Sequence, residues 1–335
     1  MKEYKGYIGS YTRKKSTGLR RFRFHPEAFL LEDFQEMEDP TYLAMDGQKK
    51  ILYGSMRKGD HHGVFSLELD TEKRQEVLVE KEATPCHVSV FSTYLLASNY
   101  HHGKVDLYRL QEGHVEKRLD SIAHEGSGPR EDRQEASHIH FAMKSPHDED
   151  ILVCDLGSDQ VYIYHVEEEK LIRKGSILLP MGTGPRHLLF SKTSPFVYIF
   201  SELTSEIFVL KKSEGSYHLK QVLSTLPEDF HGENTGAAIR FTPDEKYLYV
   251  SNRGHDSLTA FEVRTNHHLS FIDTYDAKGA HPRDFNITPD GAFLLVAHMN
   301  SHNLALFKIQ KDSGKLHFLR NDLYSPEPVS IVFQD

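Results

Sequence analysis

Histidine, arginine and glutamate are the residue types with which this chain could carry out chemistry. It contains 22 histidines in 335 residues and no tryptophan. His138 and His140 are two residues apart in SHIHF, a spacing that places both imidazoles on one side of a strand. Arg186, Glu202 and Arg253 each adjoin a short apolar run, where burying an unpaired charge is costly. Because imidazole titrates near neutral pH and guanidinium binds anionic oxygens, these residues indicate proton transfer on a small anionic molecule.

Motifs for other kinds of catalysis are absent from the sequence. It has no H-E-x-x-H or C-x-x-C pattern, and the pair His138 and His140 alone is a weak indication of zinc. It also has no G-x-S-x-G nucleophile motif, P-loop or dinucleotide-binding fingerprint. We therefore expect no metal, no nucleotide cofactor and no covalent serine chemistry.

The overall charge excludes several classes of partner. The chain has 40 basic and 49 acidic residues, a net charge of -9, so we expect no nucleic acid and no anionic membrane as partner. Mean hydropathy is -0.52, no apolar run approaches a membrane span, and the first residues lack the apolar stretch of a signal peptide. These features predict a cytoplasmic protein. Cys86 and Cys154 are too few for a disulfide framework and are expected to be buried thiols.

A repeat runs through the whole chain. Seven strand-like runs end in a small or polar residue, and the spacing between these ends varies from 43 to 57 residues. The seven ends are Ser10, Ser55, Ser98, Asp155, Ser201, Ser251 and His298. Two further strands with alternating polarity follow most of the runs, which gives four strands per unit. Four-stranded units of this length, repeated seven times, are typical of a seven-bladed β-propeller.

The two ends of the chain are incomplete in complementary ways. A short element precedes each run from the second onward, at 39–45, 84–90, 137–143, 184–190, 235–241 and 281–287. A seventh such element, 327–333, has no run after it, and the first run has no element before it. We therefore expect a single all-β domain, 1–335, of four-stranded antiparallel blades, with the last blade closed by strands from both termini. A helical solenoid is disfavoured, because Gly, Pro, Asn and Asp interrupt the chain too often.

Propeller geometry gathers particular positions at one mouth of the central channel. These are the start of the first strand of a blade, the end of the second strand, the turn after it, and the connections between blades. Twelve of the 22 histidines occupy such positions: His61, His62, His87, His101, His102, His138, His140, His187, His255, His281, His298 and His302. His124 and His231 lie in two long connections nearby. We expect a basic, histidine-rich patch at this mouth.

Some of these residues have a simpler interpretation. The doublets His61–His62, His101–His102 and His267–His268 are expected to be solvated turn residues. Arg57, Arg130 and Arg240 are expected to be surface or rim charges.

Several motifs together resemble one known family. They are YIGSYT, ASNYHHGKV, RQEASHIHF, DLGSDQV, GPRHLLF, SELTSEI, YLYVSNRGHDSLTAF and PRDFNITPDGAFLLVA. The chain is similar along nearly all its length to the propeller-type lactonases, which include bacterial 6-phosphogluconolactonases and resemble carboxymuconate cycloisomerases. The resemblance is specific from about residue 84 to 300 and weaker over 13–80. It implies a seven-bladed propeller that hydrolyses a sugar lactone without a required cofactor.

The resemblance also implies roles for residues that match the family's motifs. The matching catalytic positions are His138, Arg186, Glu202 and Arg253. The positions expected to bind substrate are Arg133, Gln134, His140, His187 and Arg283.

Hydrolysis of a δ-lactone requires activated water, a group that stabilises the oxyanion and a proton for the leaving ring oxygen. We expect His138 or Glu202 to be the general base, with Arg186 and Arg253 stabilising the oxyanion and binding the anionic substrate. The expected reaction converts 6-phosphogluconolactone to 6-phosphogluconate. The alternatives are a cycloisomerase acting on a dicarboxylate, a lactonase for an unphosphorylated lactone, a metal-dependent gluconolactonase and a non-catalytic interaction propeller. The sequence makes no prediction of the oligomeric state.

Overall fold

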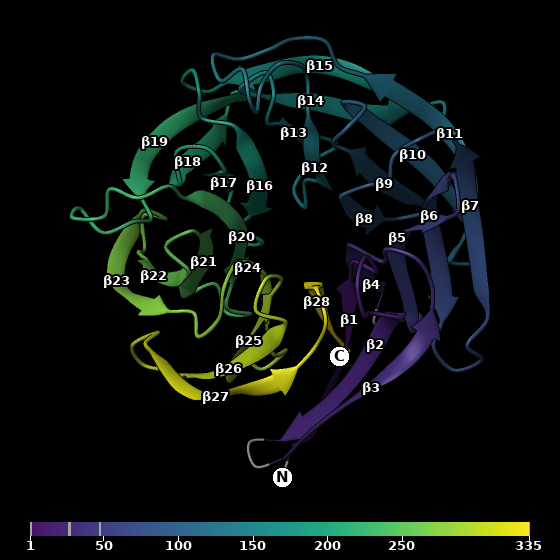
Figure 1. Ribbon diagram of the computed structural model, residues 1–335. Coiled ribbons are helices and arrows are strands. Elements are labelled where there is room, and N and C mark those ends of the chain that lie inside the picture. The colour runs from purple at the N-terminus through teal and green to yellow at the C-terminus, as the bar shows by residue number, and fades with distance from the viewer. Residues whose placement is uncertain (1, 26–27, 47, 335) are drawn as a thin grey trace.

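The computed structural model describes residues 2–25, 28–46 and 48–334. In these residues the chain forms 28 strands and no α-helix, arranged as a ring of seven four-stranded antiparallel sheets (Figure 1). The predicted seven-bladed β-propeller is therefore confirmed. In the part of the chain that the structure describes, nothing forms an apolar helix of membrane-spanning length.

Each blade is a set of consecutive strands running outward from the channel, except the blade that contains both termini. The terminal blade consists of β28 (Pro328–Gln334), β1 (Tyr4–Ser10), β2 (Gly18–His25) and β3 (Ala28–Glu36). The next three blades are β4 (Leu43–Asp46), β5 (Ile51–Lys58), β6 (His61–Glu68), β7 (Arg74–Glu80); β8 (His87–Phe91), β9 (Tyr94–Asn99), β10 (Lys104–Gln111), β11 (His114–Ala123); and β12 (Ile139–Lys144), β13 (Ile151–Asp155), β14 (Gln160–Glu167), β15 (Lys170–Leu178). The last three are β16 (Pro185–Phe190), β17 (Phe196–Ser201), β18 (Glu206–Ser213), β19 (Ser216–Ser224); β20 (Thr235–Phe241), β21 (Tyr247–Arg253), β22 (Ser257–Val263), β23 (Leu269–Asp276); and β24 (Pro282–Ile287), β25 (Phe293–His298), β26 (Asn303–Ile309), β27 (Leu316–Tyr324).

The hydrophobic core lies between neighbouring blades. Seven clusters of buried side chains each combine residues of two adjacent blades. Tyr198 and Phe200 of β17, for example, pack with Val250 of β21 and Phe261 of β22. The second strands are buried on both faces, whereas the fourth strands alternate with solvent, so the polarity pattern of each strand follows its distance from the channel.

Strands from the two ends of the chain close the ring. β28 pairs antiparallel with β1, with Ile331 opposite Ile8, which confirms the predicted closure. The backbone N–H of Ile331 donates to Asp284 Oδ2 of the preceding blade at 2.9 Å, and the N–H of Leu43 in the following blade donates to Ser330 Oγ at 3.1 Å. β28 is therefore hydrogen-bonded to the blades on both sides as well as to its own.

The closing strand should be sensitive to loss of core volume. Ile331 is fully buried, so Ile331→Ala is expected to lower the free energy of unfolding by about 2–5 kcal/mol. The same change at Ile172, which is 38% exposed on β15, is expected to cost about 0.5 kcal/mol or less. Urea denaturation of both variants measures the difference. Equal losses would contradict a closure that depends on packing of β28.

Candidate active site

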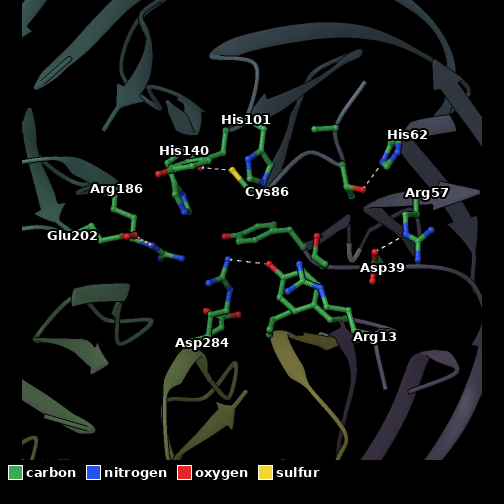
Figure 2. Close-up of a pocket in the computed structure, with 18 of the residues that line it drawn as sticks. Arg13, Asp39, Arg57, His62, Cys86, His101, His140, Arg186, Glu202 and Asp284 are labelled. Carbon is green, nitrogen blue, oxygen red and sulfur yellow. Dashed lines mark hydrogen bonds and ion pairs between the residues drawn. The ribbon is translucent and has the colours of Figure 1, made fainter. Parts of the chain in front are cut away.

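A cavity of about 870 Å³ occupies one mouth of the channel, and Figure 2 shows the charged and imidazole side chains around it. The residues lining it come from all seven blades and the connections between them. They lie at the starts of first strands, at the ends of second strands and in the turns after these, as the repeat predicts.

A backbone irregularity that recurs in three blades aims one side chain of each into this cavity. In β12, β16 and β24, the pairing with the second strand shifts between Ile139 and Phe141, between Pro185 and His187, and between Pro282 and Asp284. A bulge of this kind leaves the intervening residue unpaired and redirects it. The intervening residues are His140, Arg186 and Arg283, and all three line the cavity. Thr41, Cys86 and Val329 occupy the corresponding positions of three other blades and line it too.

The residues that follow these positions bring aromatic and imidazole rings into the channel, and Tyr42 and His187 among them line the cavity. The rings of Tyr42, His87, Phe141 and His187 pack against one another at tilted angles, with centroids 4.5 Å, 3.8 Å and 4.9 Å apart in that order. Burial, followed by the charge of a nearby arginine, holds the pKa of His87 and of His187 well below the ordinary value of 6.5. These imidazoles are therefore neutral and pack as aromatic rings.

Glu202 is the centre of the site. Its Oε2 lies 2.8 Å from Arg186 Nε and 2.9 Å from Arg253 Nη2, and its Oε1 contacts Arg133 Nη2. Glu202 and Arg186 are each 3% exposed, and Figure 2 shows them side by side at one edge of the cavity. Burial acts to raise the pKa of Glu202, but the charges of Arg253 and Arg186 outweigh it and hold the pKa well below its ordinary value. Glu202 is therefore ionised.

Backbone contacts fix this cluster between two blades. The N–H of Glu202 donates to the carbonyl of Gly184 at 2.8 Å, and its carbonyl accepts from the N–H of Gly236 at 2.9 Å. Arg186 Nη1 reaches the carbonyl of Ala237 on β20 at 2.5 Å, and Arg253 Nη2 reaches that of Gly236 at 2.7 Å. The small residues at the start of β20 leave room for both guanidinium groups.

The site has an excess of positive charge. Three guanidinium groups surround the single carboxylate of Glu202, and Arg283 has no carboxylate partner among the described residues. Four other carboxylates line the cavity. Asp284 is paired with Arg240 at 3.0 Å, Asp39 with Arg57 at 2.7 Å and Glu82 with Lys104 at 3.2 Å, whereas Asp60 has no ion pair among the described residues. Such an excess among buried side chains favours an anion that brings its own hydrogen-bond acceptors.

Neutral imidazoles border the same charges. Burial, and then the charge of Arg186, keeps the pKa of His140 well below 6.5, and its Nδ1 is buried without a hydrogen-bond partner among the described residues. Burial and the charge of Arg253 lower the pKa of His281 to about 4. Both can donate or accept a hydrogen bond without adding charge.

Seven of the nine site residues predicted from the sequence line the cavity: Arg133, His140, Arg186, His187, Glu202, Arg253 and Arg283. Gln134 is buried behind it and donates to the carbonyl of Leu156 and to Asp159 Oδ1, so it supports the loop that carries Arg133.

His138 also lies outside the lining. Its ring stacks on Tyr100 at 4.3 Å between centroids, and Tyr100 is the residue that faces the cavity. His138 Nδ1 is 3.0 Å from the carbonyl of Tyr100 and Nε2 is 3.1 Å from Glu135 Oε1. Both ring nitrogens thus face acceptors, which places His138 behind Tyr100 as a support for it.

The predicted histidine patch is smaller than expected. Five of the twelve histidines line the cavity: His62, His101, His140, His187 and His281. Others are engaged within the fold, since His298 is fully buried and His302 Nδ1 accepts the N–H of Glu327. In the doublets His61–His62 and His101–His102, one member of each lines the cavity, His62 and His101, and the other does not.

Tyr11 and Arg13 line the cavity but were not singled out in the sequence. They follow Ser10, the polar end of the first run, by one and three residues. Glu202 follows its own polar end by one residue and Arg253 by two, so a position one to three residues after a polar end is the signal that could have found them. The weak repeat over residues 13–80 concealed it. As for metals, no group of three His, Cys, Asp or Glu side chains suited to holding an ion occurs within the described ranges.

Comparison with known proteins gives a consistent result. A family model described as lactonase, 7-bladed beta-propeller, matches residues 5–333. The 6-phosphogluconolactonase of Bacillus subtilis is 34% identical, over 99% of this chain and 99% of that protein. A crystal structure of a Lactobacillus plantarum protein superposes with a TM-score of 0.94 at 31% identity, covering 100% of both chains. That of a periplasmic gluconolactonase from Pseudomonas aeruginosa does so with a TM-score of 0.91 at 25% identity, covering 99% of both.

The neutral imidazoles in the channel should make the fold sensitive to acid. His87 is uncharged when folded and takes up a proton when unfolded below its ordinary pKa of 6.5, so the free energy of unfolding falls as the pH falls below that value. Each such group lowers the free energy of unfolding by about 1.4 kcal/mol for every pH unit below that value. His87→Gln is expected to reduce the slope between pH 6 and pH 5 by about that amount. Denaturation of the wild type and the variant at several pH values measures the slope.

His218 on the exposed outer strand β19 provides the matched control. His218→Gln is expected to leave the slope unchanged. An unchanged slope in His87→Gln would mean that the channel imidazoles do not carry this dependence.

Proposed function

This chain belongs to the lactonase family of seven-bladed β-propellers and is a lactonase, and on that premise we propose that its substrate is a phosphorylated sugar δ-lactone, 6-phosphogluconolactone, which it hydrolyses to 6-phosphogluconate. The observation that carries this proposal is the excess of guanidinium groups around Glu202 in an 870 Å³ cavity. A neutral lactone would leave that excess uncompensated, whereas a substrate bearing a phosphate and yielding a carboxylate offsets it.

Arg186 and Arg253 stabilise the oxyanion. Attack on the lactone carbonyl places a negative charge on its oxygen, and buried guanidinium groups held in place by Glu202 and by backbone carbonyls need little reorganisation to receive it. Arg186 is further held by a contact of 3.1 Å between its Nη1 and His187 Nε2. Because the pKa of His187 is lowered, its ring is neutral and can accept this hydrogen bond.

Glu202 acts as the general base, since it lines the cavity and His138 does not. A carboxylate has about four acceptor positions on its two oxygens. Arg186 and Arg253 occupy those of Oε2, whereas Oε1 accepts from Arg133 alone among the described residues and keeps one position for water. When the oxyanion draws on the same arginines, their hold on Glu202 weakens and its proton affinity rises as the reaction requires.

The proton transfers balance through this one carboxylate. Water loses a proton to Glu202 while its oxygen bonds to the carbonyl carbon. The bond from that carbon to the ring oxygen then breaks, and Glu202 returns the proton to the departing oxygen. The new carboxylic acid ionises in water, so one lactone and one water give one hydroxy-acid anion and one proton.

Substitutions at Glu202 and Arg186 test this assignment. Glu202→Gln is expected to lower kcat/KM for 6-phosphogluconolactone by about 10²–10⁴, because the base is lost while the side chain keeps its size. Arg186→Ala is expected to lower kcat by about 10²–10³ through loss of an oxyanion donor. His138→Ala should cause a smaller loss than Glu202→Gln, since Tyr100 lies between His138 and the cavity. Initial rates of acid release measure all three.

Glu214→Gln, in an exposed turn, is the matched control and should retain wild-type activity. Near wild-type kcat/KM in both Glu202→Gln and Arg186→Ala would refute the site. A greater loss in His138→Ala than in Glu202→Gln would instead identify His138 as the base. Assaying a muconate in parallel separates the lactonase from a cycloisomerase.

A further inference from the structure

Two arginines of the cavity are held by a tyrosine instead of a carboxylate. The Arg13 guanidinium carbon lies 3.9 Å from the centroid of the Tyr11 ring, and that of Arg283 lies 5.7 Å from it. Arg283 Nη2 also donates to the Tyr11 hydroxyl at 3.3 Å. All three residues line the cavity, and Figure 2 shows Arg13 across from Arg186 and Glu202.

Neither arginine is paired with an acid within the ranges that the structure describes. Arg57, on the same wall of the cavity, is different, since it contacts Asp39 at 2.7 Å and Glu38 at 2.7 Å. Two like charges beside one ring repel each other, and a neutral ring compensates them weakly. The two guanidinium groups are therefore available to bind a doubly charged anion.

The distribution of charge separates this pair from the Glu202 cluster while keeping it nearby. Arg283 lies at the bulge of β24, in the blade that follows the one carrying Arg253. Burial lowers the pKa of both Arg253 and Arg186, and the charge of Arg283 adds to this lowering, so Arg283 is within electrostatic reach of the Glu202 cluster.

We propose that Arg13, Arg283 and the Tyr11 hydroxyl form the subsite for the phosphate group of the substrate. This inference rests on the proposed function and adds to it the residues that recognise the phosphorylated end. A phosphate monoester carries about two negative charges at neutral pH, which matches the two guanidinium charges. Arginine binds phosphate through two parallel hydrogen bonds, and the tyrosine hydroxyl can donate a further one. The lactone carbonyl then points toward Arg186, Arg253 and Glu202.

The test compares 6-phosphogluconolactone with glucono-δ-lactone, which lacks the phosphate. In Arg13→Ala and in Arg283→Ala, the ratio of the two kcat/KM values is expected to fall about 10- to 100-fold from the wild-type ratio, as the loss of a charge-assisted hydrogen bond predicts. Hydrolysis of glucono-δ-lactone should change little in Arg13→Ala. Arg13→Lys keeps the charge but loses the paired geometry, so it should recover only part of the ratio.

Lys15 provides the control, because it is an exposed cation on the same loop and does not line the cavity. Lys15→Ala removes the same charge and should keep the wild-type ratio. A similar fall in Lys15→Ala would mean that any positive charge on this loop produces the effect without a specific contact, and it would overturn the subsite. An unchanged ratio in Arg13→Ala and Arg283→Ala would overturn it as well, while leaving the lactonase proposal intact.

Binding measurements separate failure of the subsite from failure of the proposed function. Calorimetry compares 6-phosphogluconate with gluconate in the wild type, in Arg13→Ala and in Arg283→Ala. Tighter binding of 6-phosphogluconate that is lost in both variants supports the subsite even if neither lactone is hydrolysed, in which case only the proposed reaction fails. Equal binding of the two acids by the wild type overturns the subsite.

Discussion

The buried carboxylate of Glu202 is the interaction on which the rest of the site depends. It offsets part of the charge of three arginines that come from two blades and a long connection, and without it those guanidinium groups would repel one another in a place nearly closed to water. The peptide of Glu202 is also bonded to the start of the next blade. The same residue therefore holds the blades in register and keeps the arginines ready for an anion. Its own pKa is held down by the charges it compensates, so the cluster is ionised as a unit.

The propeller brings these residues together by repeating one local structure. Six blades present the residue at the start of their first strand to the cavity, and in three of them a bulge turns that residue inward. The backbone is nearly the same in each blade, but the side chain is His140 in one, Arg186 in the next and Arg283 in another. The following residue points down the channel, where aromatic and neutral imidazole rings close it. The repeat thus supplies the positions, and single residues at those positions supply the chemistry.

The charge distribution explains how an acidic protein can receive an anion. The net charge of -9 reflects the whole surface, whereas the substrate would meet the local balance at the channel mouth. There Asp39 and Asp284 are neutralised by Arg57 and Arg240, three further arginines share the single carboxylate of Glu202, and Arg13 and Arg283 have no acidic partner among the described residues. Burial keeps the nearby imidazoles neutral, which prevents them from adding to the repulsion.

The fold and most of the site could be predicted from the sequence, because both depend on patterns of local order. Strand periodicity, the spacing of polar ends and the unmatched termini determined a closed seven-bladed ring. Position within the repeat placed Arg186, Glu202, Arg253 and Arg283 at one mouth. Only the tertiary structure decided which side chains face the cavity. His138 fits the pattern yet packs behind Tyr100, and Gln134 supports a loop, because a neighbouring residue takes the inward direction in each case. Tyr11 lies against Arg283, 272 positions away, and Arg13 packs on the ring of Tyr11; no periodicity along the chain records such pairing in space.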